Sequence, residues 1–123
     1  MIPQPDSFQD LQLEIIRRTS FNELDGEKVH AELLAHRDLW KSALIDRLNS
    51  LTKLRDLHLD IWNADTLFIL PAEGKEDELF KLAKKWNADE VNWIGREEAC
   101  DLLQHWNDDS TSNSKVILRL WWD

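Results

Sequence analysis

The sequence predicts a small α/β domain, in which a short parallel sheet of three strands carries helices on both faces. The first observation behind this is that the C-terminal half alternates short apolar runs with helical patterns, as βαβ units with right-handed crossovers do. The second is the motif WNAD, which begins at Trp62 and again at Trp86. With 123 residues the chain has the size of one domain, residues 1–123.

Residues 1–62 are predicted to form a mainly helical N-terminal part, which packs on a βαβαβ part, residues 63–123. A first helix is expected to begin after Ser7, because a serine side chain suits the position that caps a helix. The apolar residues that follow share one face at helical spacing. They are Phe8, Leu11 and Ile15.

A long helix is predicted next, over residues 27–49. Its apolar stripe comprises Val29, Leu33, Trp40, Leu44 and Leu48. The following segment, residues 52–62, is ambiguous, because its leucines fit both a helix and an alternating strand. We favour the helix, because Trp62 then matches Trp86, which ends a clearly helical pattern.

The βαβαβ part is predicted from its alternating apolar segments. The strands are residues 66–71, 90–94 and 115–122, the helices are residues 76–86 and 96–106, and a polar loop covers residues 107–114. The first strand is apolar on both faces, which is typical of a central strand. The last strand has a mixed second face, which indicates an edge. The predicted order is therefore 2-1-3, with the first strand in the middle.

The WNAD motif is interpreted as a connector from a helix to a strand. Trp62, Trp86 and Trp106 each end a predicted helix and are each followed by Asn. Asn tolerates the left-handed conformation that closes a helix, and the Asp two residues later suits the turn before a strand. The alternative is a ligand site built from the Asp carboxylates, but such loops lie at the end of the sheet where ligands seldom bind.

Composition excludes several classes of function. The net charge of −9 disfavours nucleic acid and anionic membrane surfaces as partners. Cys100 is the only cysteine, so no internal disulfide forms, and a small buried side chain is its expected role. No signal peptide and no apolar run long enough to span a bilayer is visible, so a soluble, cytoplasmic protein is expected.

The chain contains seven Trp and no Tyr. The first interpretation is a Trp-rich core, because a buried indole contributes a large apolar area. The alternative is a binding site that depends on exposed Trp side chains, since Trp is enriched at interfaces.

Two predicted loops could bind an anion. In each, a strand is followed by a glycine, a basic residue and a helix: Gly74 with Lys75, and Gly95 with Arg96. Glycine lets the backbone approach a ligand, and free N–H groups at a helix start attract anions. Acidic residues also begin both helices and oppose such binding.

Residues 82–99 resemble helix-strand segments of Rossmann-type dehydrogenase domains. The stretch lacks their glycine fingerprint, so the resemblance implies no cofactor. The four His residues are scattered, and no metal site is expected. No catalytic residue is identified, because neither a serine nucleophile motif nor a His partner for Cys100 is visible.

The last predicted strand is apolar and ends in two Trp, which favours association. We expect Arg119, Trp121 and Trp122 to contribute to a homodimer or to an interface with a protein partner, because Trp and Arg are typical of binding hot spots. The sequence therefore favours a non-catalytic regulatory or interaction protein. The alternative is a domain that binds a small molecule or nucleotide through the two glycine loops.

Overall fold

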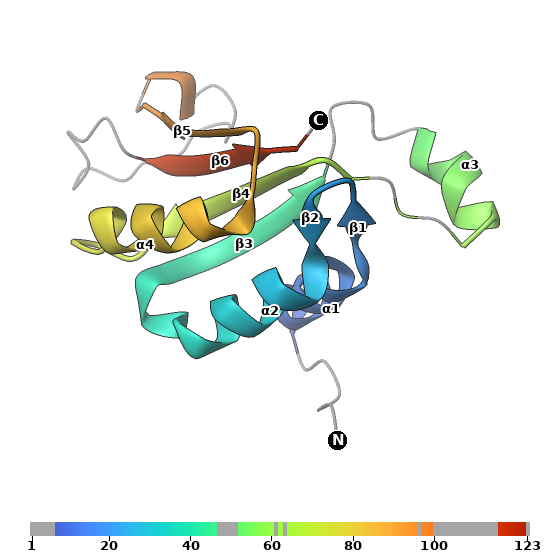
Figure 1. The fold of residues 1–123 in the computed structure, drawn as a ribbon, viewed down its shortest axis with the longest axis horizontal. Helices are drawn as coiled ribbons and strands as arrows, with labels where there is room; N and C mark the ends of the chain where they lie inside the picture. The colour runs from blue at the N-terminus through green and yellow to red at the C-terminus, as the bar shows by residue number, and fades with distance from the viewer. Residues whose placement is uncertain are drawn as a thin grey trace.

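The computed structural model describes residues 7–46, 52–60, 62, 64–95, 97–99 and 116–122. The chain forms an α/β domain around a four-stranded sheet with strand order β3-β4-β6-β5, in which all neighbouring strands are antiparallel (Figure 1). The strands are β3 (Trp40–Asp46), β4 (Thr66–Pro71), β5 (Glu90–Ile94) and β6 (Ile117–Trp121). The predicted α/β class is confirmed.

The predicted parallel sheet of three strands and its order 2-1-3 are wrong. The crossover itself exists: β4 and β5 run in the same direction, because both are antiparallel to β6, and α4 (Glu76–Ala83) connects them. β6 lies between the two strands, so β6 is not the predicted edge. Alternation along a strand shows which side chains share a face, but it carries no information on direction or neighbours.

The predicted long helix over residues 27–49 is also wrong. Helix α2 (Gly26–Ala35) is followed by the short 3-10 helix η1 (Arg37–Leu39), and β3 then begins. Burial alternates along β3: Ala43 and Ile45 are buried, whereas Leu44 between them is 42% exposed. The predicted stripe continued from α2 into β3 through Trp40 and Leu44. These two side chains lie on opposite faces of the strand, because its register shifts between Trp40 and Ser42.

Most other predicted elements agree with the structure. Helix α1 (Phe8–Arg18) begins as expected, with the Ser7 Oγ accepting a hydrogen bond from the Asp10 N–H at 3.0 Å. The connector before α2 contains a small hairpin, made by β1 (Ser20–Phe21) and β2 (Leu24–Asp25). Helix α3 (Thr52–His58) confirms a helix in the ambiguous segment, although it ends before Trp62.

The connector role of WNAD is confirmed at its second copy only. Trp86 ends the 3-10 helix η2 (Lys84–Trp86), and Asn87 takes the left-handed conformation, with φ 60°. The first copy does not follow a helix directly, because α3 ends at His58. The third copy, at Trp106, lies outside the described residues, as do Cys100 and most of the predicted helix 96–106.

One sheet face carries the main core. Helices α1, α2 and α4 pack their apolar residues on it. These are Leu13, Ile16, Val29, Leu33, Leu79 and Leu82, and they meet Ala43, Ile45, Leu67, Ile69, Leu118 and Leu120 of the sheet. A smaller cluster lies on the opposite face, where the helical residues 97–99 bury Ala99 against Ile94 and Ile117.

Three Trp side chains lie in the core, and each indole N–H has a partner. Trp40 donates to the carbonyl of Leu33 at 2.9 Å, and Trp86 donates to the Glu32 carboxylate at 2.6 Å. Trp122 donates to the carbonyl of Trp86 at 3.0 Å. A buried indole N–H needs such a partner, and these bonds join β3, α2, η2 and the end of β6.

Candidate functional site

The sheet face opposite α1, α2 and α4 presents polar and apolar side chains from all four strands; we call it the open face. Residues paired across antiparallel strands lie side by side on one face. The register therefore places Leu44 beside Phe68, and Arg119 between Phe68 and Asn92. The adjacent row contains Asp46, Thr66, Trp121 and Glu90.

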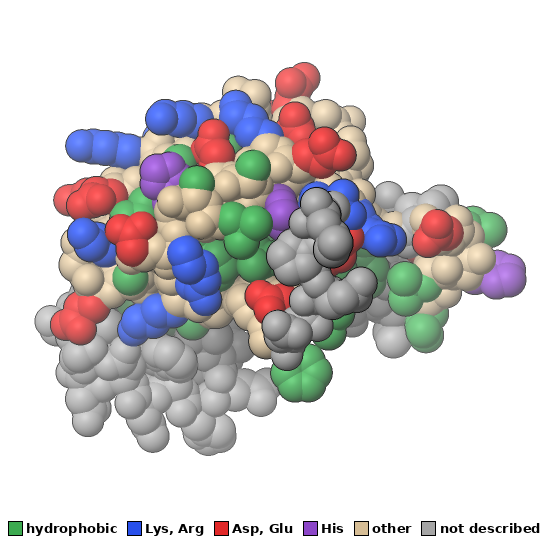
Figure 2. All heavy atoms as spheres, turned by 90° about the horizontal axis from the view of Figure 1, so that it is seen from below, with side chains coloured by type: hydrophobic (Ala, Val, Ile, Leu, Met, Phe, Trp, Pro, Cys, Tyr) green, Lys and Arg blue, Asp and Glu red, His purple; other side chains and the backbone are tan. Residues whose placement is uncertain are grey.

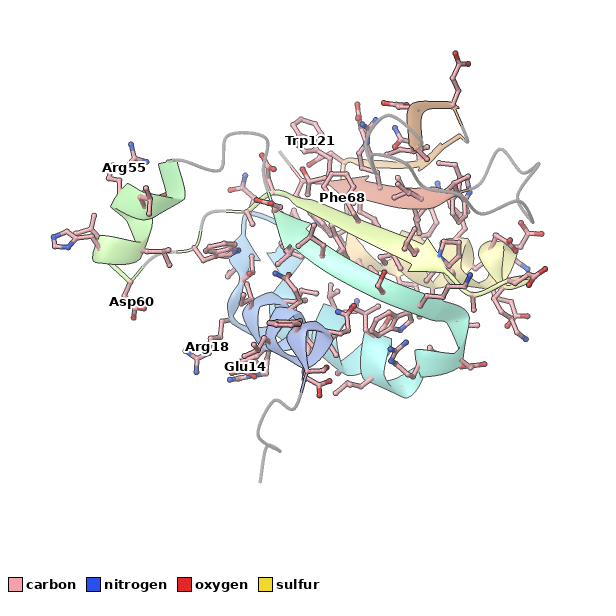
Figure 3. The ribbon with its side chains drawn as sticks, turned by 180° about the vertical axis from the view of Figure 1, so that it is seen from behind. Glu14, Arg18, Arg55, Asp60, Phe68 and Trp121 are labelled. Atoms are coloured by element: carbon pink, nitrogen blue, oxygen red, sulfur yellow. The ribbon has the colours of Figure 1, made fainter. Side chains whose placement is uncertain are left out.

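The open face carries apolar side chains that solvent reaches. Leu44 is 42% exposed, and Phe68 and Trp121 are partly exposed. Figure 3 labels Phe68 and Trp121 on neighbouring strands, seen from the side opposite to Figure 1. An apolar groove of about 170 Å³ runs along β3, β4 and the start of β6. It is lined by Ser42, Ala43, Leu44, Phe68, Ile69, Leu70 and Ile117.

Arg119 lies in the interior of this face, on the central strand β6. Its Nε donates to the Asn92 Oδ1 at 3.2 Å, which fixes the side chain across β5. No salt bridge to Arg119 is formed by any described carboxylate. Among the described residues, the guanidinium is therefore tied to an amide oxygen and not to a carboxylate.

Of the three residues expected at an interface, the structure brings two to the open face. Arg119 and Trp121 lie on one side of β6, as the alternation predicts, whereas Trp122 is fully buried in the main core. Because β6 is paired on both sides, its backbone offers no free edge to a partner strand. Lys115, the predicted start of this strand, lies outside the described residues.

Sequence reasoning missed Leu44 and Phe68 as members of this surface. Leu44 was assigned to a helix stripe, and Phe68 to a strand buried on both faces. The sequence held no clear signal for Leu44, because Ala43, Leu44 and Ile45 are all apolar and only the structure separates them into two faces.

The two predicted anion loops lie at the same end of the sheet, because β4 and β5 run in the same direction. Gly74 has φ +79°, a backbone conformation that favours glycine. A Cβ added there would meet nothing within 4 Å, so glycine is required by the turn and not by a close contact. The Lys75 Nζ lies 3.7 Å from the Glu78 carboxylate. Gly95 accepts a bond from the Ala99 N–H at 2.9 Å, and Arg96 lies outside the described residues. Anion binding here stays a prediction.

A polar groove of about 690 Å³ lies where α1 ends beside the hairpin. Its lining is Arg17, Arg18, Thr19, Ser20, Asn22, Glu23, Leu24, Asp25, Gly26, Glu27 and Asn87. Both arginines bind the Glu14 carboxylate, Arg17 through two hydrogen bonds and Arg18 through one of 2.9 Å. Glu23, Asp25 and Glu27 also line the groove, so it offers no surplus of positive charge to an anion.

The Glu14 carboxylate yields a prediction on pH. Hydrogen bonds from Arg17 first, and from Arg18 second, lower the pKa of Glu14 from 4.5 to about 2. Because the folded pKa is depressed, the stability that this carboxylate contributes is present above pH 4.5 and is lost as the pH falls through about 2. We expect Arg17→Ala to return the Glu14 pKa toward 4.5, and Arg18→Ala to raise it less. Carboxyl-carbon NMR titration of the three proteins measures this, and an unchanged pKa in Arg17→Ala contradicts it.

A second apolar surface lies on α3, which stands apart from the sheet and its helices (Figure 1). Its leucines are largely exposed, with exposed fractions of 71% for Leu54 and 55% for Leu57, and Leu59 just after the helix is 62% exposed. Figure 2 shows hydrophobic side chains on this projecting end, next to a main body on which acidic and basic side chains are interspersed. The helix predicted here therefore does not bury its leucine face in the described structure.

Two further observations concern the described residues alone. No three His, Cys, Asp or Glu side chains among them lie close enough together to hold a metal ion. None of their helices combines the length and the apolar character that crossing a bilayer requires.

Comparison with known proteins returns no relative: no family model, no curated protein and no solved structure matches this chain. Its function is therefore inferred from its own geometry.

Proposed function

We propose that this protein is a non-catalytic regulatory or interaction protein, which associates through the open face with a second copy of itself or with another protein. The observation that carries the proposal is the placement of partly exposed Phe68, Trp121 and Leu44 around Arg119. Aromatic residues and Arg dominate the energetics of protein interfaces. A cytoplasmic setting is part of this proposal.

The chemistry of the open face supports association over catalysis. Its groove is lined almost entirely by apolar side chains, with Ser42 as the one hydroxyl among them. A general acid, base or nucleophile needs a titratable group held at the reacting atoms, and this groove provides none. Arg119, held by Asn92, instead supplies fixed donors beside apolar area, which suits recognition of a protein surface.

The test compares Trp121→Ala with Leu34→Ala, which removes a side chain of 51% exposure on α2, away from the open face. If the protein self-associates, sedimentation velocity at high micromolar concentration shows a dimer for the wild type and for Leu34→Ala, and a monomer for Trp121→Ala. Leu34→Ala is the control for loss of exposed apolar area as such.

If the wild type is a monomer, a second copy of the chain is excluded as the partner. Proteins retained from a lysate by wild type and Leu34→Ala, but not by Trp121→Ala or Phe68→Ala, then identify the surface used by another protein. Equal retention by all four proteins contradicts the use of the open face.

The alternative is binding of a small anion or nucleotide by Gly74, Lys75, Gly95 and Arg96. It is favoured by the common direction of β4 and β5, which brings both loops to one end of the sheet. The Glu78 partner of Lys75 opposes it. Loss of nucleotide binding in the double variant of Lys75→Ala and Arg96→Ala, with association unchanged, distinguishes it from the leading proposal.

A further inference from the structure

The two edge strands of the sheet, β3 and β5, differ in how their outward backbone groups are bonded. At the β3 edge, the Gln9 side-chain amide donates to the carbonyl of Ala43 and accepts from its N–H, both at 2.9 Å. The Gln12 Oε1 accepts from the N–H of Ile45 at 3.2 Å. Side chains of α1 thus take the place of a neighbouring strand, which protects this edge from pairing with another chain.

The β5 edge has no such cover among the described residues. Backbone groups alternate in direction along an antiparallel strand. The Trp122 N–H donates to the Asp65 carbonyl, so the even-numbered residues of β6 direct their backbone groups toward β4. The odd-numbered residues of β6, such as Arg119, therefore direct theirs toward β5. Their partners on β5 are its even-numbered residues. The N–H and C=O groups of Val91 and Trp93 therefore point away from the sheet, and no described strand pairs with them.

The side chains at this edge favour an ordered strand. Trp93 stacks on Phe80 of α4, with ring centroids 6.2 Å apart, and the Lys84 ammonium lies 5.1 Å from the Phe80 ring centre. These contacts hold β5 against α4 without using its outward backbone groups.

The charge around the edge is acidic. Asp89 and Glu90 are exposed at the start of β5, and Glu97 and Glu98 are exposed just beyond its end. The chain as a whole carries a net charge of −9. The Lys84 ammonium lies over the Phe80 ring.

We infer that β5 accepts an extended, basic peptide segment of another protein as a fifth strand of the sheet. Backbone groups of Val91 and Trp93 provide the hydrogen bonds, and the acidic residues at both ends of the strand select a basic segment. A second copy of this chain fits poorly, because its own β5 edge carries the same exposed acidic residues. This edge is distinct from the open face, with which it shares Glu90, and its hydrogen bonds come from the backbone of Val91 and Trp93.

Hydrogen exchange followed by NMR tests whether the edge is free. In the isolated protein we expect the Val91 and Trp93 amides to exchange fast, and the Asn92 amide, which faces β6, to be protected. Adding a short, end-blocked synthetic peptide in which Lys and Arg alternate with Val should slow exchange at Val91 and Trp93. Strong protection of both amides before the peptide is added overturns the inference, because the edge is then already covered.

A pair of variants tests the binding mode. Proline is tolerated at an edge position whose N–H points outward, so Val91→Pro keeps the pairing of β5 with β6 but removes a donor. Val91→Thr keeps that donor and is the matched control. We expect the basic peptide to bind Val91→Pro about tenfold more weakly or worse, and to bind Val91→Thr and Trp121→Ala as it binds wild type. Unchanged binding to Val91→Pro overturns strand addition.

A second peptide tests whether the partner must be basic. A peptide with Glu in place of Lys and Arg should bind at least about tenfold more weakly, because it meets Glu90, Glu97 and Glu98. Equal binding of the two peptides overturns the assignment of a basic partner. A wild-type dimer that Val91→Pro converts to a monomer overturns it as well, since the occupant is then a second copy.

Discussion

Replacing Trp122 with Ala is expected to destabilise the fold by about 3–5 kcal/mol, the usual cost of removing a fully buried Trp. The Trp122 side chain is 0% exposed and lies in the main core with Trp86. Its loss removes apolar area, leaves a cavity and takes away the hydrogen bond that the indole N–H donates to the Trp86 carbonyl. Domains of this size have a free energy of unfolding of about 5–15 kcal/mol, so the loss is a large part of the stability.

The neighbouring residue provides the control. Trp121 has the same side chain, but it points to the open face and is only partly buried. Trp121→Ala should therefore cost about 2 kcal/mol or less. Urea unfolding followed by circular dichroism compares the three proteins without depending on Trp fluorescence. Equal losses in the two variants contradict the assignment of Trp122 to the core and Trp121 to the surface.

The expectation that Trp121 and Trp122 both contribute to an interface did not use the alternation along the last strand, which separates the two residues. Alternation places Leu118, Leu120 and Trp122 on one side of the last strand, and the structure buries all three. A period of two is a local property, so the sequence of one strand is enough to detect it. The direction of the strand and its position between β4 and β5 depend on contacts between distant segments, which that period does not encode.

The open face was predictable only in part, for the same reason. Arg119 and Trp121 could be assigned to a common side of β6. That Phe68 and Leu44 lie beside them depends on the antiparallel register and on β3 being a strand. The sequence analysis predicted neither feature. Residues 66–71 do form an interior strand, since β4 lies between β3 and β6, but β4 does not lie between the other two predicted strands, as the order 2-1-3 required.

Gly26→Ala is the second substitution for which a large effect is expected. Gly26 starts α2, and its N–H donates to the Thr19 carbonyl at 3.1 Å, which brings the two backbones together. A Cβ at this position would lie 2.1 Å from the carbonyl oxygens of both Ile16 and Thr19. Backbone atoms cannot move aside as a flexible side chain does, so α1 and α2 must separate. We expect a loss of about 3 kcal/mol or more in the free energy of unfolding, at the upper end of the range for overpacking.

Gly74→Ala is the matched control, because the physical cause is different. A Cβ there meets nothing within 4 Å, and the cost comes from the left-handed backbone, with φ +79°. That cost is of the order of 1 kcal/mol. Urea unfolding of both variants ranks the two effects. A smaller loss for Gly26→Ala than for Gly74→Ala would mean that α1 and α2 can move apart freely. In that case the glutamines of α1 would not hold the β3 edge rigidly, and the contrast between the two sheet edges would weaken.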